Sequence, residues 1–204
     1  MDILFPVIMA VPPAYSDLPG GERQRALSRY ARMPLAVSAQ KAGFVLPVDP
    51  GKDERGAPRP AGGLWWSVTH KPGFVGGLVS RGRIGIDVEE IVSVSDGLFK
   101  KIVSPAEERL FDGDRWLTFF RCWTAKEAVL KATGRGLGGL AACRVAAVAD
   151  ATRLALVFAD TPWMVEHFYF AGHLAAVAAT AKMAMQWTLL EAPAEERSRS
   201  ELEG

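Results

Sequence analysis

Two acidic residues in the segment IGIDVE (84–89) are spaced so that both could take part in one reaction. Asp87 and Glu89 are separated by one residue in a stretch with strand character, so both side chains point to one face and the apolar residues take the other. Two carboxylates side by side need a counter-charge, and Mg²⁺ prefers oxygen ligands of this kind. A solvent-exposed strand end is the alternative, because Asp-x-Glu alone is a weak motif.

A third acid lies on a helix that we expect over residues 115–133. Aromatic and aliphatic residues recur there at helical spacing, and Gly134 suits the position just after a helix end. Glu127 and Lys131 are four residues apart and therefore share one face. A surface ion pair beside a core stripe is the simple interpretation. If the helix faces Asp87, however, Glu127 would be a third ligand for the same cation.

Basic residues accompany these acids. Lys126 adjoins Glu127, and His70 and Lys71 occupy a turn after an expected strand, a suitable place for a phosphate contact, although a lone loop histidine is often incidental. Three acids and these cations suit a metal-assisted reaction at a phosphate or pyrophosphate. The chain has no G-x-S-x-G, Walker A or G-x-G-x-x-G sequence, so nothing supports a serine hydrolase or a nucleotide-binding loop.

Helices and short strands must position these residues. Ser104, Pro105 and Glu107 predict a helix start with a capping box. The other expected helices are 22–32, 34–44, a short one from Ser95 or Asp96 through Ile102, and 115–133. Strands are expected at 2–11, as a β-meander at 64–69, 74–80 and 83–89, and again at 143–149, 153–158, 164–170, 173–180 and 185–190. The charged segment 191–204 is expected to be disordered.

The composition is that of an ordinary globular protein. The chain has 204 residues, of which 49% are hydrophobic, and a net charge of +1, which gives no argument for binding nucleic acid or a membrane. Cys122 falls in the helical stripe, so we expect a buried thiol rather than a disulfide. The apolar start MDILFPVIMA lacks the pattern of a secretion signal or a membrane span. We therefore expect a cytoplasmic protein.

In this order and spacing, the motifs resemble those of the 4′-phosphopantetheinyl transferases of the Sfp type. The resemblance rests on IGIDVE (84–89), WTAKEAVLK (123–131) and GRGL (134–137), with SVTH (67–70) and Phe99 followed by SPAE (104–107). This family moves the phosphopantetheine arm of coenzyme A to a serine of an acyl or peptidyl carrier protein and releases 3′,5′-ADP. The resemblance implies a pseudo-twofold, duplicated α+β fold. Each lobe would have helices packed on an antiparallel β-meander, in residues 1–90 and 91–190, and a monomer would suffice.

The resemblance also implies roles for individual residues. Asp87, Glu89 and Glu127 would bind Mg²⁺ together with the pyrophosphate of coenzyme A. Glu127 would deprotonate the carrier serine, directly or through water, and Lys131 would stabilise charge as the phosphoanhydride breaks. Asp87, Glu127 and Lys131 are therefore the implied catalytic residues. The implied contacts to coenzyme A are His70, Lys71, Arg32, Lys126 and Lys131.

The sequence departs from the family pattern upstream of SVTH. The family often has Gly-Lys-Pro there, whereas Gly56-Ala57-Pro58 has alanine in place of the lysine that meets a phosphate; Arg55 or Arg59 could substitute. Arg32 is our choice for the 3′-phosphate among the arginines of 22–32, although a solvated helix face also explains them. Two other functions stay open. One is a non-catalytic protein that binds coenzyme A or a carrier protein, and the other is a metal-dependent phosphoesterase.

Overall fold

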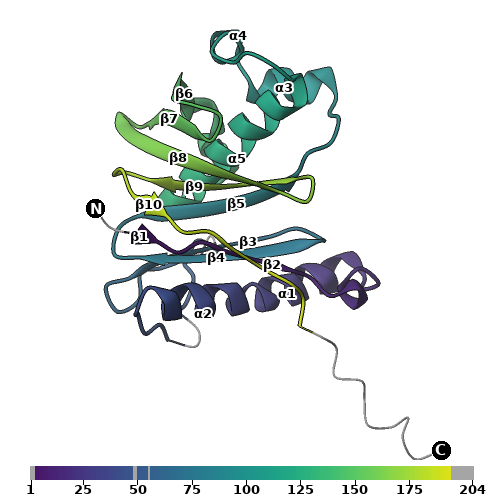
Figure 1. The fold of residues 1–204 in the computed structure, drawn as a ribbon, viewed down its shortest axis with the longest axis vertical. Helices are drawn as coiled ribbons and strands as arrows, with labels where there is room; N and C mark the ends of the chain where they lie inside the picture. Colours follow the sequence, from purple (N-terminus) through teal and green to yellow (C-terminus); the bar gives the residue numbers. More distant parts are fainter. Residues whose placement is uncertain (1–2, 48–49, 55, 194–204) are drawn as a thin grey trace, which may run out of the picture.

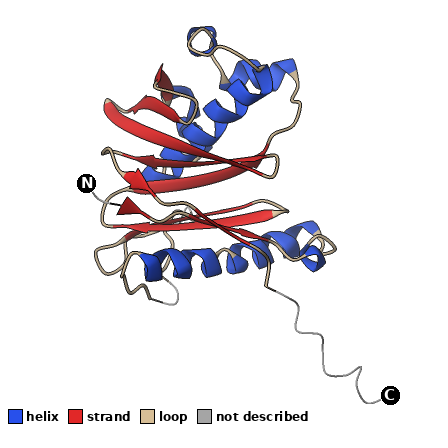
Figure 2. Ribbon diagram, viewed as in Figure 1, coloured by secondary structure: helices blue, strands red, loops and turns tan. Residues whose placement is uncertain are grey.

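The computed structural model describes residues 3–47, 50–54 and 56–193. Within them, helices pack on largely antiparallel sheets (Figures 1 and 2), so the expected α+β class is confirmed. The disorder expected at 191–204 falls mostly on 194–204, which lies outside the described residues. In the part of the chain that is described, no helix combines the length and the apolar character needed to cross a membrane.

The helices follow their local signals. Asp114 accepts a hydrogen bond from Leu117 N at the start of the long helix, and Gly134 ends it in the left-handed conformation. The capping box of Ser104 and Glu107 is present. The α-helices are α1 (Gly20–Tyr30), α2 (Arg32–Lys41), α3 (Asp96–Ile102), α4 (Pro105–Glu108) and α5 (Arg115–Thr133), and the 3-10 helices are η1 (Pro13–Tyr15) and η2 (Leu137–Ala142).

The first sheet has the strand order β11-β2-β4-β3. Its strands are β2 (Val7–Ala10), β3 (Trp65–His70), β4 (Phe74–Ser80) and β11 (Thr188–Leu190). A short parallel pair, β1 (Ile3–Leu4) and β10 (Ala184–Met185), lies beside it. Helices α1 and α2 cover the outer face of this sheet (Figure 1). Gly77 allows α2 to approach, because a Cβ at this position would lie 2.3 Å from Leu35 N.

The second sheet has the strand order β5-β9-β8-β7-β6. Its strands are β5 (Ile84–Glu90), β6 (Arg144–Val148), β7 (Arg153–Phe158), β8 (Thr161–Phe170) and β9 (His173–Ala179). Strands β6 to β9 form an antiparallel meander. The predicted meander at 64–89 is wrong in its last strand, because β5 leaves β4 and pairs with β9, with Asp87 opposite Ala176.

The packing of β5 explains this pairing. Ile86 and Val88 belong to a buried cluster with Leu78 of the first sheet, so one face of β5 lies between the sheets. The opposite face lies against α5, where a Cβ at Gly85 would come within 1.9 Å of the carbonyl oxygen of Ala128. Strand β5 is therefore packed on both faces, and it is an edge strand of the second sheet. The predicted division into residues 1–90 and 91–190 stays a prediction, and the pairings of β5 with β9 and of β11 with β2 cross it.

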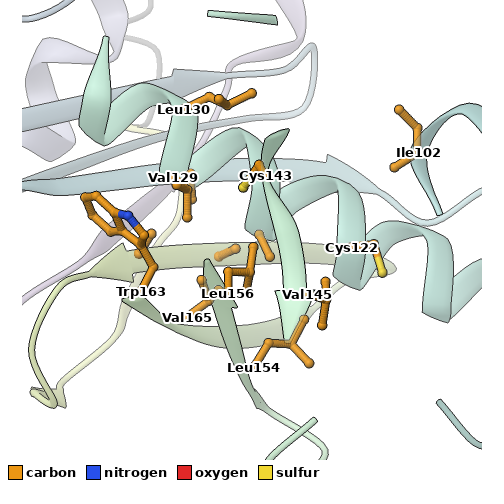
Figure 3. Close-up of a cluster of buried hydrophobic side chains, with 14 of the residues drawn as sticks. Ile102, Cys122, Val129, Leu130, Cys143, Val145, Leu154, Leu156, Trp163 and Val165 are labelled. Atoms are coloured by element: carbon orange, nitrogen blue, oxygen red, sulfur yellow. The ribbon is translucent and has the colours of Figure 1, made fainter. Parts of the chain in front are cut away.

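A large core holds α5 against the second sheet (Figure 3). Val129 and Leu130 of the helix pack with Trp163 and Leu156 of the strands, and all four side chains are almost fully buried. Cys122 is a buried free thiol, as predicted. Burial raises the pKa of this thiol to about 12, so it stays protonated and acts as an apolar side chain. The core thus fixes which face of α5 turns away from the sheet.

Candidate active site

A pocket of about 500 Å³ opens where strand β3, strand β5 and the second half of α5 meet. The segment before β3 and the turn after α5 complete its wall. The structure brings six of the predicted site residues to this pocket: His70, Lys71, Asp87, Glu89, Glu127 and Lys131. These residues come from separate parts of the sequence, and the fold brings them together as the motifs predict.

Asp87 is held at the centre of the pocket wall. Its carboxylate is buried, with 4% of the residue exposed, and its Oδ1 lies 2.7 Å from Lys131 Nζ. The same ammonium donates to the carbonyl oxygen of Ile86 at 3.1 Å, and the Thr69 hydroxyl donates to Asp87 Oδ1 at 3.3 Å. Asp87 Oδ2 is buried and has no hydrogen-bond partner among the described residues. One carboxylate oxygen is therefore anchored and the other is available to a ligand.

Glu89 projects from the same face of β5, as the strand alternation predicts. Its Oε2 lies 2.7 Å from Lys71 Nζ, and its Oε1 accepts a hydrogen bond of 2.9 Å from the indole of Trp123. Burial, and then the negative charge of Asp87, raise the pKa of Glu89. Trp123 is half-buried and stacks on Phe119 at 6.4 Å between ring centroids. The helix thus orients Glu89 through a side chain of its own apolar stripe.

Glu127 faces the pocket from α5, opposite β5. Its Oε1 is buried and has no hydrogen-bond partner among the described residues. Burial is the largest cause that raises the pKa of Glu127, and the charge of Asp87 is the next, while Lys131 acts in the opposite direction. A carboxylate with a raised pKa binds a proton more readily, which is the property that a general base needs. The expectation that Glu127 turns toward Asp87 agrees with the shared pocket.

No group of three or more His, Cys, Asp or Glu residues in the described ranges is arranged to hold a metal ion. The donor set nevertheless suits a hard cation, because two buried carboxylate oxygens, Asp87 Oδ2 and Glu127 Oε1, have no hydrogen-bond partner in the part of the chain that is described. Lys131 and Lys71 neutralise Asp87 and Glu89 in this structure.

The His70 ring lies at the pocket wall near several cations. Burial, followed by the positive charge of Lys131, lowers the pKa of His70, and Lys52 and Lys71 act in the same direction. At neutral pH His70 is therefore an uncharged imidazole, which can donate a hydrogen bond from one ring nitrogen and accept one at the other. It suits a hydrogen bond to a phosphate oxygen better than an ion pair.

The structure puts Lys126 outside the pocket, contrary to its expected contact with coenzyme A. Its Nζ lies 2.9 Å from Glu107 Oε1 and donates to the Ile102 carbonyl oxygen at 2.6 Å. The side chain is 5% exposed. The physical reason is helical geometry, since adjacent residues on α5 point about 100° apart and Glu127 takes the pocket face. Lys126 thus joins α5 to α4 and to the end of α3.

Arg32 also lies away from the pocket. Its guanidinium stacks over the Trp66 ring at 4.7 Å, and the residue borders a separate, mostly apolar groove beside α2. It begins α2, which covers the far side of the first sheet. The expected contact with a 3′-phosphate therefore finds no support in its position. Arg55, one of the two arginines considered as a substitute for lysine at position 57, lies outside the described residues.

Two cations that were not predicted from the motifs border the pocket. Lys52 lies before the Gly56-Ala57-Pro58 segment, and Arg135 lies in the turn after α5. Both were visible as basic residues in glycine-rich loops, but the sequence gives no distance between those loops. Their shared position depends on a contact between the loops, because a Cβ at Gly134 would lie 3.4 Å from that of Ala57.

Comparison with known proteins identifies the region that contains most of this site. Residues 83–181 match the family model of the 4′-phosphopantetheinyl transferase superfamily. The chain is 35% identical over 121 residues to "4'-phosphopantetheinyl transferase HetI" of Nostoc sp., which covers 51% of each protein. It is 37% identical over 82 residues to "Putative 4'-phosphopantetheinyl transferase slr0495" of Synechocystis sp., which covers 37% of this chain and 33% of that protein. The matches therefore span about half of the first of these relatives and a third of the second. They confirm the predicted resemblance to 4′-phosphopantetheinyl transferases.

Proposed function

We propose that this protein, whose residues 83–181 match the family model of the 4′-phosphopantetheinyl transferase superfamily, transfers the phosphopantetheine arm of coenzyme A to a serine of an acyl or peptidyl carrier protein. The observation that carries the proposal is the pocket in which Asp87, Glu127 and Lys131 meet. A pocket that combines buried carboxylates with an ammonium group suits a polyanionic substrate whose reaction redistributes negative charge. The second product is 3′,5′-ADP.

Glu127 is the proposed general base. The serine oxygen of the carrier attacks the phosphorus of the phosphopantetheine group, a new P–O bond forms, and the phosphoanhydride bond to 3′,5′-ADP breaks. The serine proton passes to Glu127, directly or through one water molecule. The burial that raises the pKa of this carboxylate also makes it a better proton acceptor near neutral pH.

Lys131 is the proposed electrostatic partner of the leaving group. Its ammonium is 29% exposed at the side chain, so a bound pyrophosphate can reach it while Asp87 holds it in place. As the phosphoanhydride bond breaks, negative charge grows on the departing 3′,5′-ADP oxygen, and a fixed cation stabilises that charge. His70 and Lys71 line the same pocket and are the proposed contacts to other phosphate oxygens.

Asp87, Glu89 and Glu127 are the proposed ligands of Mg²⁺. The support is chemical, since all three offer carboxylate oxygens and two of these oxygens are buried without partners among the described residues. When bound, the ion supplies charge neutralisation at the pyrophosphate. Burial, followed by the negative charge of Asp87, raises the pKa of both Glu89 and Glu127, as expected for acids that lie close to another carboxylate.

A transfer assay tests this function. The protein is mixed with an apo carrier protein, coenzyme A and Mg²⁺, and the carrier is weighed by mass spectrometry. The expected result is a gain of one phosphopantetheine group and release of an equal amount of 3′,5′-ADP. Several carriers from fatty-acid, polyketide and peptide synthesis should be tried, and no mass gain on any of them would overturn the proposal.

Variants locate the reaction in the pocket. Glu127→Gln and Asp87→Ala should each lower the transfer rate at least about a hundredfold, whereas Lys41→Met, at the exposed end of α2, should leave it unchanged. Unchanged rates in the first two variants would remove these residues from the mechanism. Binding of coenzyme A without transfer would favour a non-catalytic binding protein, and 3′,5′-ADP release without a carrier would favour a phosphoesterase.

The same proposal includes a duplicated architecture with the lobes 1–90 and 91–190. It also includes a monomeric state and a cytoplasmic location. Two observations support the duplication. Helices cover the outer face of each sheet (Figure 1). The segments GFVGGL (73–78) and GHLAAV (172–177) are loosely alike in pattern, and both lead from a turn into an interior strand of their sheet. Superposition of α2, β3 and β4 on α5, β8 and β9 tests the duplication, and a different order or direction of these elements would contradict it. Light scattering tests the monomer.

A further inference from the structure

Lys71 and Glu89 form an ion pair at the pocket wall. The Lys71 ammonium lies 2.7 Å from Glu89 Oε2, and the Trp123 indole donates to Glu89 Oε1 at 2.9 Å. Both carboxylate oxygens of Glu89 therefore have a protein partner. Asp87 and Glu127 differ, because each has a buried oxygen without a hydrogen-bond partner among the residues that the structure describes. Of the three acids, Glu89 is thus the one whose two oxygens are both engaged by the protein.

Repulsion between cations makes this ion pair an obstacle to a metal ion. An oxygen that contacts an ammonium group accepts a second cation poorly, because the two positive charges repel at short range. Asp87 avoids this conflict, since Lys131 holds its Oδ1 and leaves Oδ2 to a ligand. At Glu89 the charged competitor is Lys71, so full use of this carboxylate as a metal ligand requires the ammonium to leave.

The lysine is the member of the pair that can move. Its side chain is 39% exposed, whereas that of Glu89 is 13% exposed. The backbone of Lys71 is fixed at the turn between β3 and β4, where Lys71 N donates to the Phe74 carbonyl oxygen at 2.8 Å and Phe74 N donates to that of Lys71 at 3.3 Å. Because a lysine ammonium sits on a flexible four-carbon stem, it can reach a new partner in the same pocket without movement of the turn.

Neither of the two roles proposed for this pair can be filled while the pair stands. Glu89 is a proposed metal ligand, and Lys71 is a proposed contact to a phosphate oxygen. In the ion pair, each charge compensates the other. Opening the pair makes both groups available together, a carboxylate for the metal ion and an ammonium for the phosphate. Both residues line the same pocket, so this exchange needs no change in the fold.

We propose that Lys71 competes with the metal ion for Glu89, and that its ammonium turns to the phosphate groups of coenzyme A when the ion displaces it. The inference rests on the proposed transferase function, because it takes a metal ion and coenzyme A as ligands of this pocket. Each ligand stabilises the open pair, so each promotes binding of the other, and such coupling acts equally in both directions. The metal ion alone therefore binds weakly, and the pocket is complete only when substrate phosphates accompany it.

The affinity for a metal ion alone provides the first test. Mn²⁺ takes oxygen ligands as Mg²⁺ does, and electron paramagnetic resonance counts the free ion, so Mn²⁺ is titrated into the protein without coenzyme A or carrier. Lys71→Met and Lys71→Gln should each bind Mn²⁺ about fivefold more tightly than the wild-type protein, as expected for loss of a competing, partly exposed ion pair. Lys71→Arg keeps the charge and should stay within about twofold of the wild-type protein. Equal or weaker binding in Lys71→Met and Lys71→Gln would overturn the proposal.

A second background separates competition for Glu89 from repulsion through space. In Glu89→Gln no carboxylate is left for Lys71 to hold, so addition of Lys71→Met should change the Mn²⁺ affinity by less than about twofold. Tightening as large as in the wild-type background would show that Lys71 only repels the ion, which would overturn the proposal. Thermal unfolding of each variant is measured alongside, so that loss of the fold is not mistaken for an effect on the site. Lys41→Met, at the exposed end of α2, should leave the Mn²⁺ affinity unchanged.

The affinity for coenzyme A should shift in the opposite direction. With saturating Mn²⁺ and no carrier, calorimetry should show that Lys71→Met binds coenzyme A about tenfold more weakly than the wild-type protein, because a charge-assisted contact to phosphate is lost. Tighter binding of Mn²⁺ together with unchanged binding of coenzyme A would overturn the transfer of the ammonium to phosphate.

These titrations do not depend on turnover, so they separate the inference from the proposed function. If no carrier is modified but the two affinities shift in opposite directions in Lys71→Met, the transferase proposal fails and the exchange at Lys71 stands. If transfer occurs and neither affinity shifts, the exchange at Lys71 fails alone.

Discussion

Lys131 and Asp87 form the contact that joins the helix to the strand at the pocket. The ammonium lies 2.7 Å from Asp87 Oδ1 and also donates to the Ile86 carbonyl oxygen, so one side chain of α5 contacts both backbone and side chain of β5. Gly85, one residue before Ile86, lets the two elements come this close. The ion pair therefore fixes a distance between elements as well as a charge.

Replacing Lys131 should affect the reaction more than the fold. Lys131→Met removes a cation that stabilises the leaving group, and we expect the transfer rate constant to fall about 10²–10³-fold. Lys131→Arg keeps the charge but changes its shape, so it should recover only part of the rate. The measurement is kcat with saturating coenzyme A and carrier. A rate unchanged in Lys131→Met would show that the ion pair with Asp87 is only structural.

Trp123 should matter through its indole N–H. Trp123→Phe keeps an aromatic ring beside Phe119 but removes the hydrogen bond to Glu89 Oε1. We expect the transfer rate to fall about tenfold, the equivalent of the ~1.5 kcal/mol typical of a hydrogen bond to a charged group. Trp116→Phe, a similar change on the same helix outside the pocket lining, is the matched control. Equal rates for the two variants would contradict a positioning role of Trp123 for Glu89.

Lys126 should contribute to stability. Its ammonium and the Glu107 carboxylate are both 5% exposed at the side chain, and Glu107 also accepts hydrogen bonds from Ser104 N and Val145 N. These contacts outweigh burial and lower the pKa of Glu107. Lys126→Met leaves a buried carboxylate without its cation, and we expect a loss of about 3–5 kcal/mol in the free energy of unfolding.

A double variant separates charge from shape at this position. Lys126→Met combined with Glu107→Gln removes both charges, and it should recover a substantial part of the stability lost in the single variant. Urea denaturation at pH 7 measures both. If the double variant is less stable than Lys126→Met alone, the loss comes from packing or from the Ile102 contact rather than from an unpaired charge.

Local rules predicted the elements around the site well. The bounds of α5 follow from Asp114 and Gly134, and the common direction of Asp87 and Glu89 follows from strand alternation. The pairing of β5 with β9 was not predictable in this way. Both faces of β5 are packed against other elements, so the alternation of its side chains does not identify the sheet it joins, and adjacency in sequence favoured β4.

A similar reason explains why Lys126 was wrongly expected in the pocket and why Lys52 and Arg135 were not expected there. In the motif Lys126 is adjacent to Glu127, but adjacent residues of a helix point in different directions. The motif also gives no sign that Glu107 is the ion-pair partner of Lys126. Lys52 and Arg135 lie in loops, whose relative position depends on one contact between Gly134 and Ala57. Sequence patterns predict which residues share one face of a helix or strand. The contact between two loops beside a pocket depends on the tertiary structure, which such patterns do not give.

His167 gives the fold a dependence on pH that does not involve the pocket. The ring is 3% exposed, with Nδ1 3.1 Å from the Thr152 carbonyl oxygen and Nε2 3.2 Å from that of Arg121. Burial, assisted by the charge of Arg121, lowers the pKa of His167 to about 4. The two carbonyl contacts favour the protonated ring and offset only part of this effect.

The lowered pKa predicts that acid destabilises the protein through His167. The unfolded chain, with a histidine pKa near 6.5, binds a proton before the folded chain does. The contribution of His167 is therefore complete above about pH 6.5 and is lost as the pH falls toward 4. Between pH 7.5 and pH 5 the loss should be about 2 kcal/mol, from 1.36 kcal/mol per pH unit below 6.5.

Urea denaturation at several pH values tests this expectation against a variant without the imidazole. His167→Gln should be less stable than the wild-type protein at pH 7.5, because a buried site is altered, but its free energy of unfolding should fall about 2 kcal/mol less on going to pH 5. Carboxylates titrate in both proteins and cancel in the comparison. His173→Gln, at the start of β9, controls for the loss of a histidine as such. Parallel pH curves for the wild-type protein and His167→Gln would show that the buried ring keeps an ordinary pKa.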